Sequence, residues 1–242
     1  DFGAMRVEAT SAYMKFQMFT RAGVLVDEYT IGGSAPIVTS ITRQNASPTN
    51  AGTVNFQVAF SESVSGVDAS DFILSTNLNG ASISTVTGLG NSYTVSVNTG
   101  SGDGTLRLDL ADNDSILNSL NIPLGGVGAA NGNFTSVDTY TVDKSSPVII
   151  SITPASLNPT NAATVDFAVI FSEPVSGVDI SDFIPISSNG AALVNITGTG
   201  TNYTVTVATG SGNDSLRIDF IDNDTVTDLA GNVTSTGFTN GG

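Results

Sequence analysis

The chain lacks several residue types, and each absence excludes a class of chemistry. Its 242 residues contain no cysteine, so disulfide bonds and thiol chemistry are excluded. Histidine is absent too, which excludes Ser-His-Asp and Cys-His catalysis, histidine general bases and ordinary zinc sites. Carboxylates alone can catalyse hydrolysis, but they need a cleft to do so. The fold predicted below, a row of β-sandwich domains, rarely provides such a cleft, so we expect no enzyme activity.

Positive charge is scarce. Seven Lys and Arg stand against 22 Asp and Glu, which gives a net charge of −15. Such a chain is repelled by nucleic acids and anionic membranes, so we expect neither as a partner. No apolar run is long enough to span a bilayer and no signal peptide is visible, so membrane insertion is not expected. The chain opens inside strand-like sequence, which favours a processed or excised start.

A repeat is the main feature that the sequence does contain. The segment 26–31, Val-Asp-Glu-Tyr-Thr-Ile, returns at 137–142 as Val-Asp-Thr-Tyr-Thr-Val. The likeness continues, since Ser-Ala-Pro-Ile at 34–37 matches Ser-Ser-Pro-Val at 145–148. Two long repeats follow Pro36, and the later copy of the segment closes the first. We find no third copy to close the second repeat before Gly242.

Both repeats consist of short segments rich in Val, Thr, Ile and Phe, separated by Gly, Asn and Ser turns, which predicts an all-β sandwich. Seven strands are expected in the first repeat and six in the second. Those of the first are 37–43, 53–60, 72–76, 81–87, 92–98, 105–110 and 137–142. Aromatic residues recur at equivalent positions and are predicted to lie in the cores: Phe60 and Phe171, Phe72 and Phe183, Tyr93 and Tyr203. Arg107 and Arg217 alternate with apolar neighbours and should face solvent or pair with nearby Asp.

Residues 1–31 differ in composition and predict three short strands, Met5–Thr10, Tyr13–Phe19 and Val24–Ile31. Asp-Phe-Gly-Ala-Met-Arg-Val-Glu at 1–8, Met-Lys-Phe-Gln-Met-Phe at 14–19 and Gly-Val-Leu-Val-Asp-Glu-Tyr-Thr-Ile at 23–31 resemble the last strands of calcineurin-like metallophosphatases. In that family these strands carry no catalysis. The metal-binding motifs of the family require histidine, so the resemblance does not imply the activity here.

The repeats carry further motifs. Phe-Ser-Glu-(Ser/Pro)-Val-Ser-Gly-Val-Asp-x-Ser-Asp-Phe, Gly-Ser-Gly-(Asp/Asn)-(Gly/Asp), Asp-Asn-Asp and Leu-Ala-Gly-Asn at 229–232 resemble tandem bacterial Ig-like domains of surface proteins. That resemblance implies extracellular spacers, adhesin stalks or assembly modules without a common ligand. The predicted fold is therefore all-β, with two tandem Ig-like β-sandwiches after an N-terminal β segment. The predicted ranges are 1–35, 36–143 and 144–242, the last lacking its final strand.

The unmatched copy suggests a hypothesis of self-assembly. The segment Leu25, Val26, Asp27, Glu28, Tyr29, Thr30 and Ile31 would donate a strand to the incomplete second domain of a neighbour, with Leu25, Tyr29 and Ile31 pointing the same way. This contact is heterologous and does not close, so it predicts a head-to-tail extracellular filament of identical chains. The alternative is a spacer or stalk excised from a larger cell-surface adhesin or secreted enzyme, whose missing strand follows Gly242.

Acidic turns offer a possible calcium site. Asp112 and Asp114 flank Asn113, and Asp222 and Asp224 flank Asn223, a ligand set suited to Ca²⁺. Similar acidic residues occur at Asp68, Asp71, Asp179 and Asp182, near Glu62 and Glu173. The alternative is that Asp and Asn only stabilise turns by bonding to the backbone. No other cofactor is expected.

Overall fold

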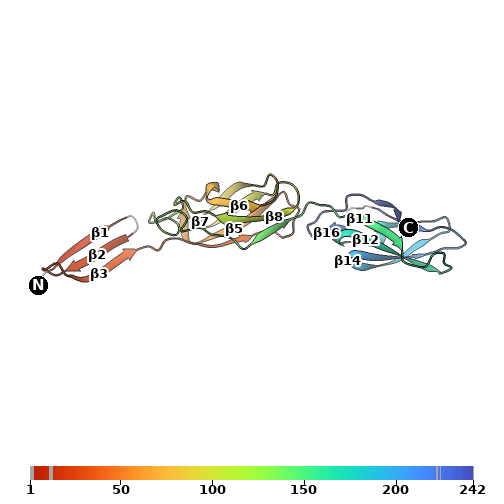
Figure 1. The fold of residues 1–242 in the computed structure, drawn as a ribbon, viewed down its shortest axis with the longest axis horizontal. Coiled ribbons are helices and arrows are strands. Elements are labelled where there is room, and N and C mark those ends of the chain that lie inside the picture. The colour runs from red at the N-terminus through yellow and green to blue at the C-terminus, as the bar shows by residue number, and fades with distance from the viewer. Residues whose placement is uncertain (1–2, 11–12, 222, 224, 242) are drawn as a thin grey trace. The chain divides into compact units, whose positions relative to one another are not determined.

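The computed structural model describes residues 3–10, 13–221, 223 and 225–241, and it confirms the predicted all-β fold (Figure 1). The chain divides into two compact units. Asp1–Ala46 and Ala51–Thr141 form the first, and Ser47–Asn50 and Val142–Gly242 form the second. Among the described residues, no helix has the length and apolar character needed to cross a membrane.

The first unit begins with a three-stranded antiparallel sheet of order β1-β2-β3. Its strands are β1 (Ala4–Ala9), β2 (Tyr13–Phe19) and β3 (Leu25–Gly32). The alternation of apolar and polar residues gives the sheet two different faces. One face is polar, and there Lys15 Nζ lies 2.9 Å from Glu28 Oε1. The other is apolar and exposed, with side-chain exposures of 41–66% at Met5 (64%), Val7 (48%), Met14 (41%), Met18 (52%), Tyr29 (66%) and Ile31 (55%).

The rest of the first unit is a sandwich of two sheets. One sheet has the order β4-β5-β7, with β4 (Val38–Arg43), β5 (Thr53–Ser65), β7 (Ser82–Asn98) and the short β9 (Leu117–Asn118) paired to β5. The other has the order β10-β8-β6, with β10 (Thr139–Val142), β8 (Gly104–Leu110) and β6 (Phe72–Thr76). Buried residues alternate with less buried ones along most of β5 and β8, and they form the core between the sheets: Val54, Phe56, Val58, Phe60 and Val64 in β5, and Leu106, Leu108 and Leu110 in β8. A short 3-10 helix, η1 (Ala69–Asp71), precedes β6.

The second unit repeats this arrangement. One sheet contains β11 (Ile149–Pro154), β12 (Thr164–Ser176) and β14 (Ala192–Ala208), with β16 (Thr227–Asp228) paired to β12. The other has the order β13-β15-β17, with β13 (Phe183–Ile186), β15 (Arg217–Phe220) and β17 (Phe238–Gly241). The 3-10 helix η2 (Ile180–Asp182) precedes β13. The pairing registers match those of the first sandwich, so residues of the two units can be compared position by position.

Several strands differ from the sequence prediction. The expected strands 81–87 and 92–98 are parts of one element, β7, whose chain bends at Gly88 (φ +147°) and Gly90 (φ +69°). Ser84 Oγ donates to the Ser96 carbonyl (2.9 Å), so the two arms of β7 face each other. A side chain at Gly88 would lie 2.4 Å from the Ser92 carbonyl oxygen, so only glycine fits this bend. The short strands β9, β16 and β17 were not anticipated.

The predicted core aromatics are confirmed, since all six are buried. Edge-to-face pairs form between Phe60 and Tyr93 and between Phe171 and Tyr203, with ring centroids 5.8 Å apart in both. The predicted arginine pairing is also confirmed. Arg107 binds Asp109 (2.8 Å) and Arg217 binds Asp219 (3.2 Å). These pairs are partly exposed and contribute little to stability.

Residues 47–50 lie in the β4–β5 connection but belong to the second unit. The Asp143 N–H donates to the Thr49 carbonyl (3.0 Å), and the Asn50 N–H donates to the Ala230 carbonyl (3.2 Å). The chain therefore passes from one unit to the other three times, at 46–47, 50–51 and 141–142.

Candidate strand-closure site

The later copy of the repeated segment, residues 137–142, completes the first sandwich. Phe134 exchanges two backbone hydrogen bonds with Leu110, both 2.9 Å, and the chain then continues into β10 beside β8. Along β10, Tyr140 (0% exposed) and Val142 (1%) point into the core. Val137, just before the strand, is fully exposed. The tyrosine and the valine are therefore the residues by which this strand covers the core.

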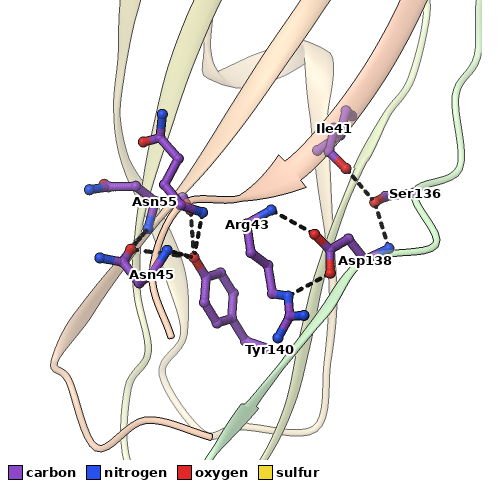
Figure 2. A network of polar contacts seen from close by, with 8 residues as sticks. Ile41, Arg43, Asn45, Asn55, Ser136, Asp138 and Tyr140 are labelled. Atoms are coloured by element: carbon purple, nitrogen blue, oxygen red, sulfur yellow. Dashed lines mark hydrogen bonds and ion pairs between the residues drawn. The ribbon is translucent and has the colours of Figure 1, made fainter. Parts of the chain in front are cut away.

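Among the described residues, the Tyr140 hydroxyl bonds to the loop after β4 and to β5, as Figure 2 shows. It accepts hydrogen bonds from the Gln44 N–H (3.0 Å) and the Asn45 N–H (2.9 Å) and donates to the Asn55 carbonyl (2.7 Å). The ring packs edge-on against Phe56, with centroids 5.1 Å apart. All three main partners of the hydroxyl are backbone groups, so this part of the site depends weakly on side-chain identity.

A second set of contacts involves side chains. The Arg43 N–H donates to Asp138 Oδ2 (2.8 Å), and the Arg43 guanidinium pairs with Asp138 Oδ1 (Figure 2). These bonds, the backbone one foremost, lower the pKa of the Asp138 carboxyl below its usual value. Ser136 Oγ donates to the Ile41 carbonyl (3.0 Å) and accepts from the Asp138 N–H (3.0 Å). We call Ile41, Arg43, Gln44, Asn45 and Asn55 the closure site of the first unit.

In the second unit, β17 occupies the place of the segment that leads into β10. Phe238 pairs with Phe220, as Phe134 pairs with Leu110, and Gly241 pairs with Ile218. The predicted bare edge is therefore covered by β17 from Ile218 to Phe220. Among the described residues, none occupies the place of Tyr140 and Val142.

The second unit is less well covered at that place. Val54, Thr99 and Leu106 are fully buried in the first unit, whereas their counterparts Val165, Thr209 and Leu216 are partly exposed. The strands differ as well: β8 starts at Gly104, but β15 starts at Arg217, three residues later by the shared register. Among the described residues, no strand lies beside residues 214–216.

The second unit has a counterpart of the closure site. It keeps the groups that would bind a tyrosine hydroxyl such as that of Tyr140, but it lacks the donors that bind Asp138. By the shared register the counterpart site consists of Ile152, Pro154, Ala155, Ser156 and Asp166. The Ala155 N–H donates to the Asp166 carbonyl (2.8 Å), just as the Gln44 N–H does to the Asn55 carbonyl (3.0 Å), so the backbone frame for a tyrosine hydroxyl is kept. Pro154 replaces Arg43, and it offers neither an N–H nor a guanidinium.

The early copy of the segment forms β3, the edge strand of the N-terminal sheet. Tyr29 and Ile31 pair with Phe16 and Met14 and belong to the exposed apolar face. The prediction that Leu25 shares their face is wrong, because a register shift between Leu25 and Asp27 pairs Leu25 with Phe19 while Asp27 pairs with Met18. Within the described part of the chain, no strand pairs with the outer edge of β3.

The acidic turns bind backbone groups. Asp112 is buried, and its carboxylate accepts from the Asp114 N–H (3.1 Å) and the Gly132 N–H (3.0 Å). Asp114 Oδ2 accepts from the Gly128 N–H (3.0 Å), and its Oδ1 is buried without a partner among the described residues. Asp222 and Asp224 lie outside the described residues. Asp68 with Asp71 and Asp179 with Asp182 form capping boxes at η1 and η2.

One acidic group was missed by the sequence analysis. Carboxylate oxygens of Asp143, Glu173 and Asp228 lie within 4.8 Å of one another in the second unit. Their counterparts in the first unit are Gly32, Glu62 and Asn118, so repetition gave no signal for this group. Asp228 already accepts from the backbone N–H groups of Ala230 and Asn232, both at 2.8 Å.

No protein-family model matches the chain. No curated protein matches it either.

Proposed function

We propose that the two sandwiches form a spacer or stalk of an extracellular, cell-surface protein and connect the N-terminal sheet to the second unit. The supporting observation is that residues 47–50 of the β4–β5 connection are built into the second unit by the bonds of Thr49 and Asn50. A stiff spacer holds its two ends at a nearly fixed separation, which a flexible linker does not. The acidic composition suits a protein that stays soluble outside the cell.

The absence of cysteine makes a direct test simple. Leu89 (83% exposed) and Leu157 (88%) lie in different units and can be replaced by cysteines for spin labels. We expect a narrow distribution of label distances at low protein concentration. Asn50→Pro, which removes the N–H that binds the Ala230 carbonyl, should broaden it.

Gly52→Ala is the matched control. It lies near Asn50, and a side chain there would meet open space. A broad distribution in the wild-type chain, equal to that of Asn50→Pro, would contradict the spacer proposal. Protease treatment of intact source cells tests the location, because a surface protein is cleaved without lysis.

A further inference from the structure

We propose that the counterpart site of the second unit accepts strand β3 from a second copy of this chain, which extends the spacer into a head-to-tail assembly. The inference goes beyond the spacer proposal and does not depend on it. β3 carries the same sequence pattern as the segment that closes the first sandwich, with Tyr29 for Tyr140 and Ile31 for Val142. Inserted in that register, these two side chains would cover Val165 and Leu216, which are partly exposed.

The strand is available for this contact. β3 is an edge strand whose only described partner is β2, and β10 pairs with one described strand, β8, apart from a single bridge between Val142 and Thr49. Tyr29 is 66% exposed and Ile31 is 55% exposed, so insertion buries apolar surface that is now in water. β3 therefore has a free edge for β15 without giving up β2.

The segments that follow both copies are bound alike. The Ile37 N–H donates to Ser61 Oγ (3.0 Å), and at the equivalent position the Val148 N–H donates to Ser172 Oγ (3.0 Å). The segment after β3 therefore binds the first sandwich in the same manner as the segment after β10 binds the second. A junction between two copies would then resemble the junction within one copy.

A second loop supports the same contact. Residues 47–50 bind Asp143 and Ala230, but their counterparts 158–161 are all exposed. By the shared register, the Asn161 N–H of one copy would donate to the Leu120 carbonyl of the next. Leu157 (88% exposed) and Leu120 (49%) are exposed hydrophobic residues in these segments, and the contact would cover them.

The two sites differ at the position where Pro154 of the second unit stands in the place of Arg43 of the first. Asp138 binds Arg43, but Asp27 would meet Pro154, which offers no donor, and would keep the bond from the neighbouring Glu28 N–H (2.8 Å). A partly buried carboxylate that gains no donor from the strand it contacts weakens binding. We therefore expect Asp27→Asn to strengthen assembly about fivefold, whereas the equivalent change in a site like that of the first unit would weaken it.

The test uses the full chain in analytical ultracentrifugation and negative-stain microscopy over a wide concentration range. We expect head-to-tail oligomers whose dissociation constant rises at least about 100-fold in Tyr29→Ala, as for loss of a buried aromatic side chain. Val26→Ser is the matched control and should assemble like the wild type, because its counterpart Val137 is fully exposed beside the seated strand. A peptide of residues 25–32 should shorten the oligomers.

A wild-type chain that stays monomeric at every concentration would overturn the proposal. So would a Tyr29→Ala variant that assembles as the wild type does, since another surface would then be in use. If Tyr29→Ala alters the circular dichroism of the sheet, Tyr29→Phe replaces it, because that variant keeps the ring and loses only the hydroxyl. Its expected weakening is about tenfold, and unchanged assembly would count against the site.

Discussion

The Tyr140 hydroxyl offers a direct measurement of how much strand closure stabilises the first sandwich. Tyr140→Phe removes one oxygen and leaves the ring against Phe56. The Gln44 N–H keeps a partner, because it also donates to the Asn55 carbonyl (3.0 Å). The Asn45 N–H loses the hydroxyl, its only partner among the described residues.

The expected loss of stability follows from the one N–H group, that of Asn45, which loses its partner. One buried N–H without a partner costs ~1–3 kcal/mol, and the loop here is only partly buried, so we expect a loss of ~1–2 kcal/mol in the free energy of unfolding of the first unit. Tyr140→Ala also leaves a cavity beside Phe56 and should cost ~3–5 kcal/mol. The second unit should be unaffected by either change.

Urea unfolding followed by hydrogen exchange of peptides from each unit separates the two effects. Tyr29→Phe is the matched control, because Tyr29 occupies the same place in the repeat but is 66% exposed in the single chain. At low concentration it should leave the stability of both units unchanged. Equal unfolding midpoints for Tyr140→Phe and Tyr29→Phe would refute the assignment of the hydroxyl as an anchor.

Two further predictions concern carboxylates. Asp214 accepts hydrogen bonds from the Ser188 hydroxyl and N–H, the Ser215 N–H and the Ser187 hydroxyl, which lower its pKa from 3.8 to about 2. A lowered pKa in the folded state means that its stabilising effect is complete above pH 3.8 and is lost as the pH falls towards 2. The difference in melting temperature between wild type and Asp214→Asn should therefore shrink over that range, and a constant difference would contradict the assignment. Asp112→Ala leaves two N–H groups without partners and should cost ~2–3 kcal/mol in urea unfolding, equally with calcium and with chelator. A stability that falls with chelator only in the wild type would show instead that the carboxylate binds a cation.

The sequence predicted the elements whose cause is local. The alternation of apolar and polar residues predicted β5 and β8, and the recurrence of Phe60 and Tyr93 in the second repeat predicted core positions. Both signals can be seen in short stretches of sequence. The bend of β7 at Gly88 was read as a break, since a glycine in a tight turn and a glycine between separate strands look alike in sequence.

The closure site could be located but not described from the sequence. The segment 137–142 was recognised as a closing strand because it repeats. Its partners in the site lie about 95 residues away in the chain, as in the bond from Arg43 to Asp138, and no local pattern pairs them. β17 was missed for a related reason. Only its pairing with β15 identifies it, because its sequence lacks the tyrosine of the repeated segment.

The division of the closure site into backbone and side-chain contacts would allow the repeats to diverge and still accept the same strand, as we propose. A tyrosine hydroxyl bound by the Gln44 and Asn45 N–H groups needs only the course of the loop, which the second unit keeps through the bond from Ala155 to Asp166. The Arg43 contact depends on one side chain, and it is lost where Pro154 stands. Tyrosine should therefore provide the affinity common to all junctions, and the aspartate position should determine which strand each sandwich prefers. Pro154→Arg tests this division. In that variant Asp27→Asn should weaken assembly instead of strengthening it, whereas Tyr29→Ala should weaken assembly as much as it does in the wild type.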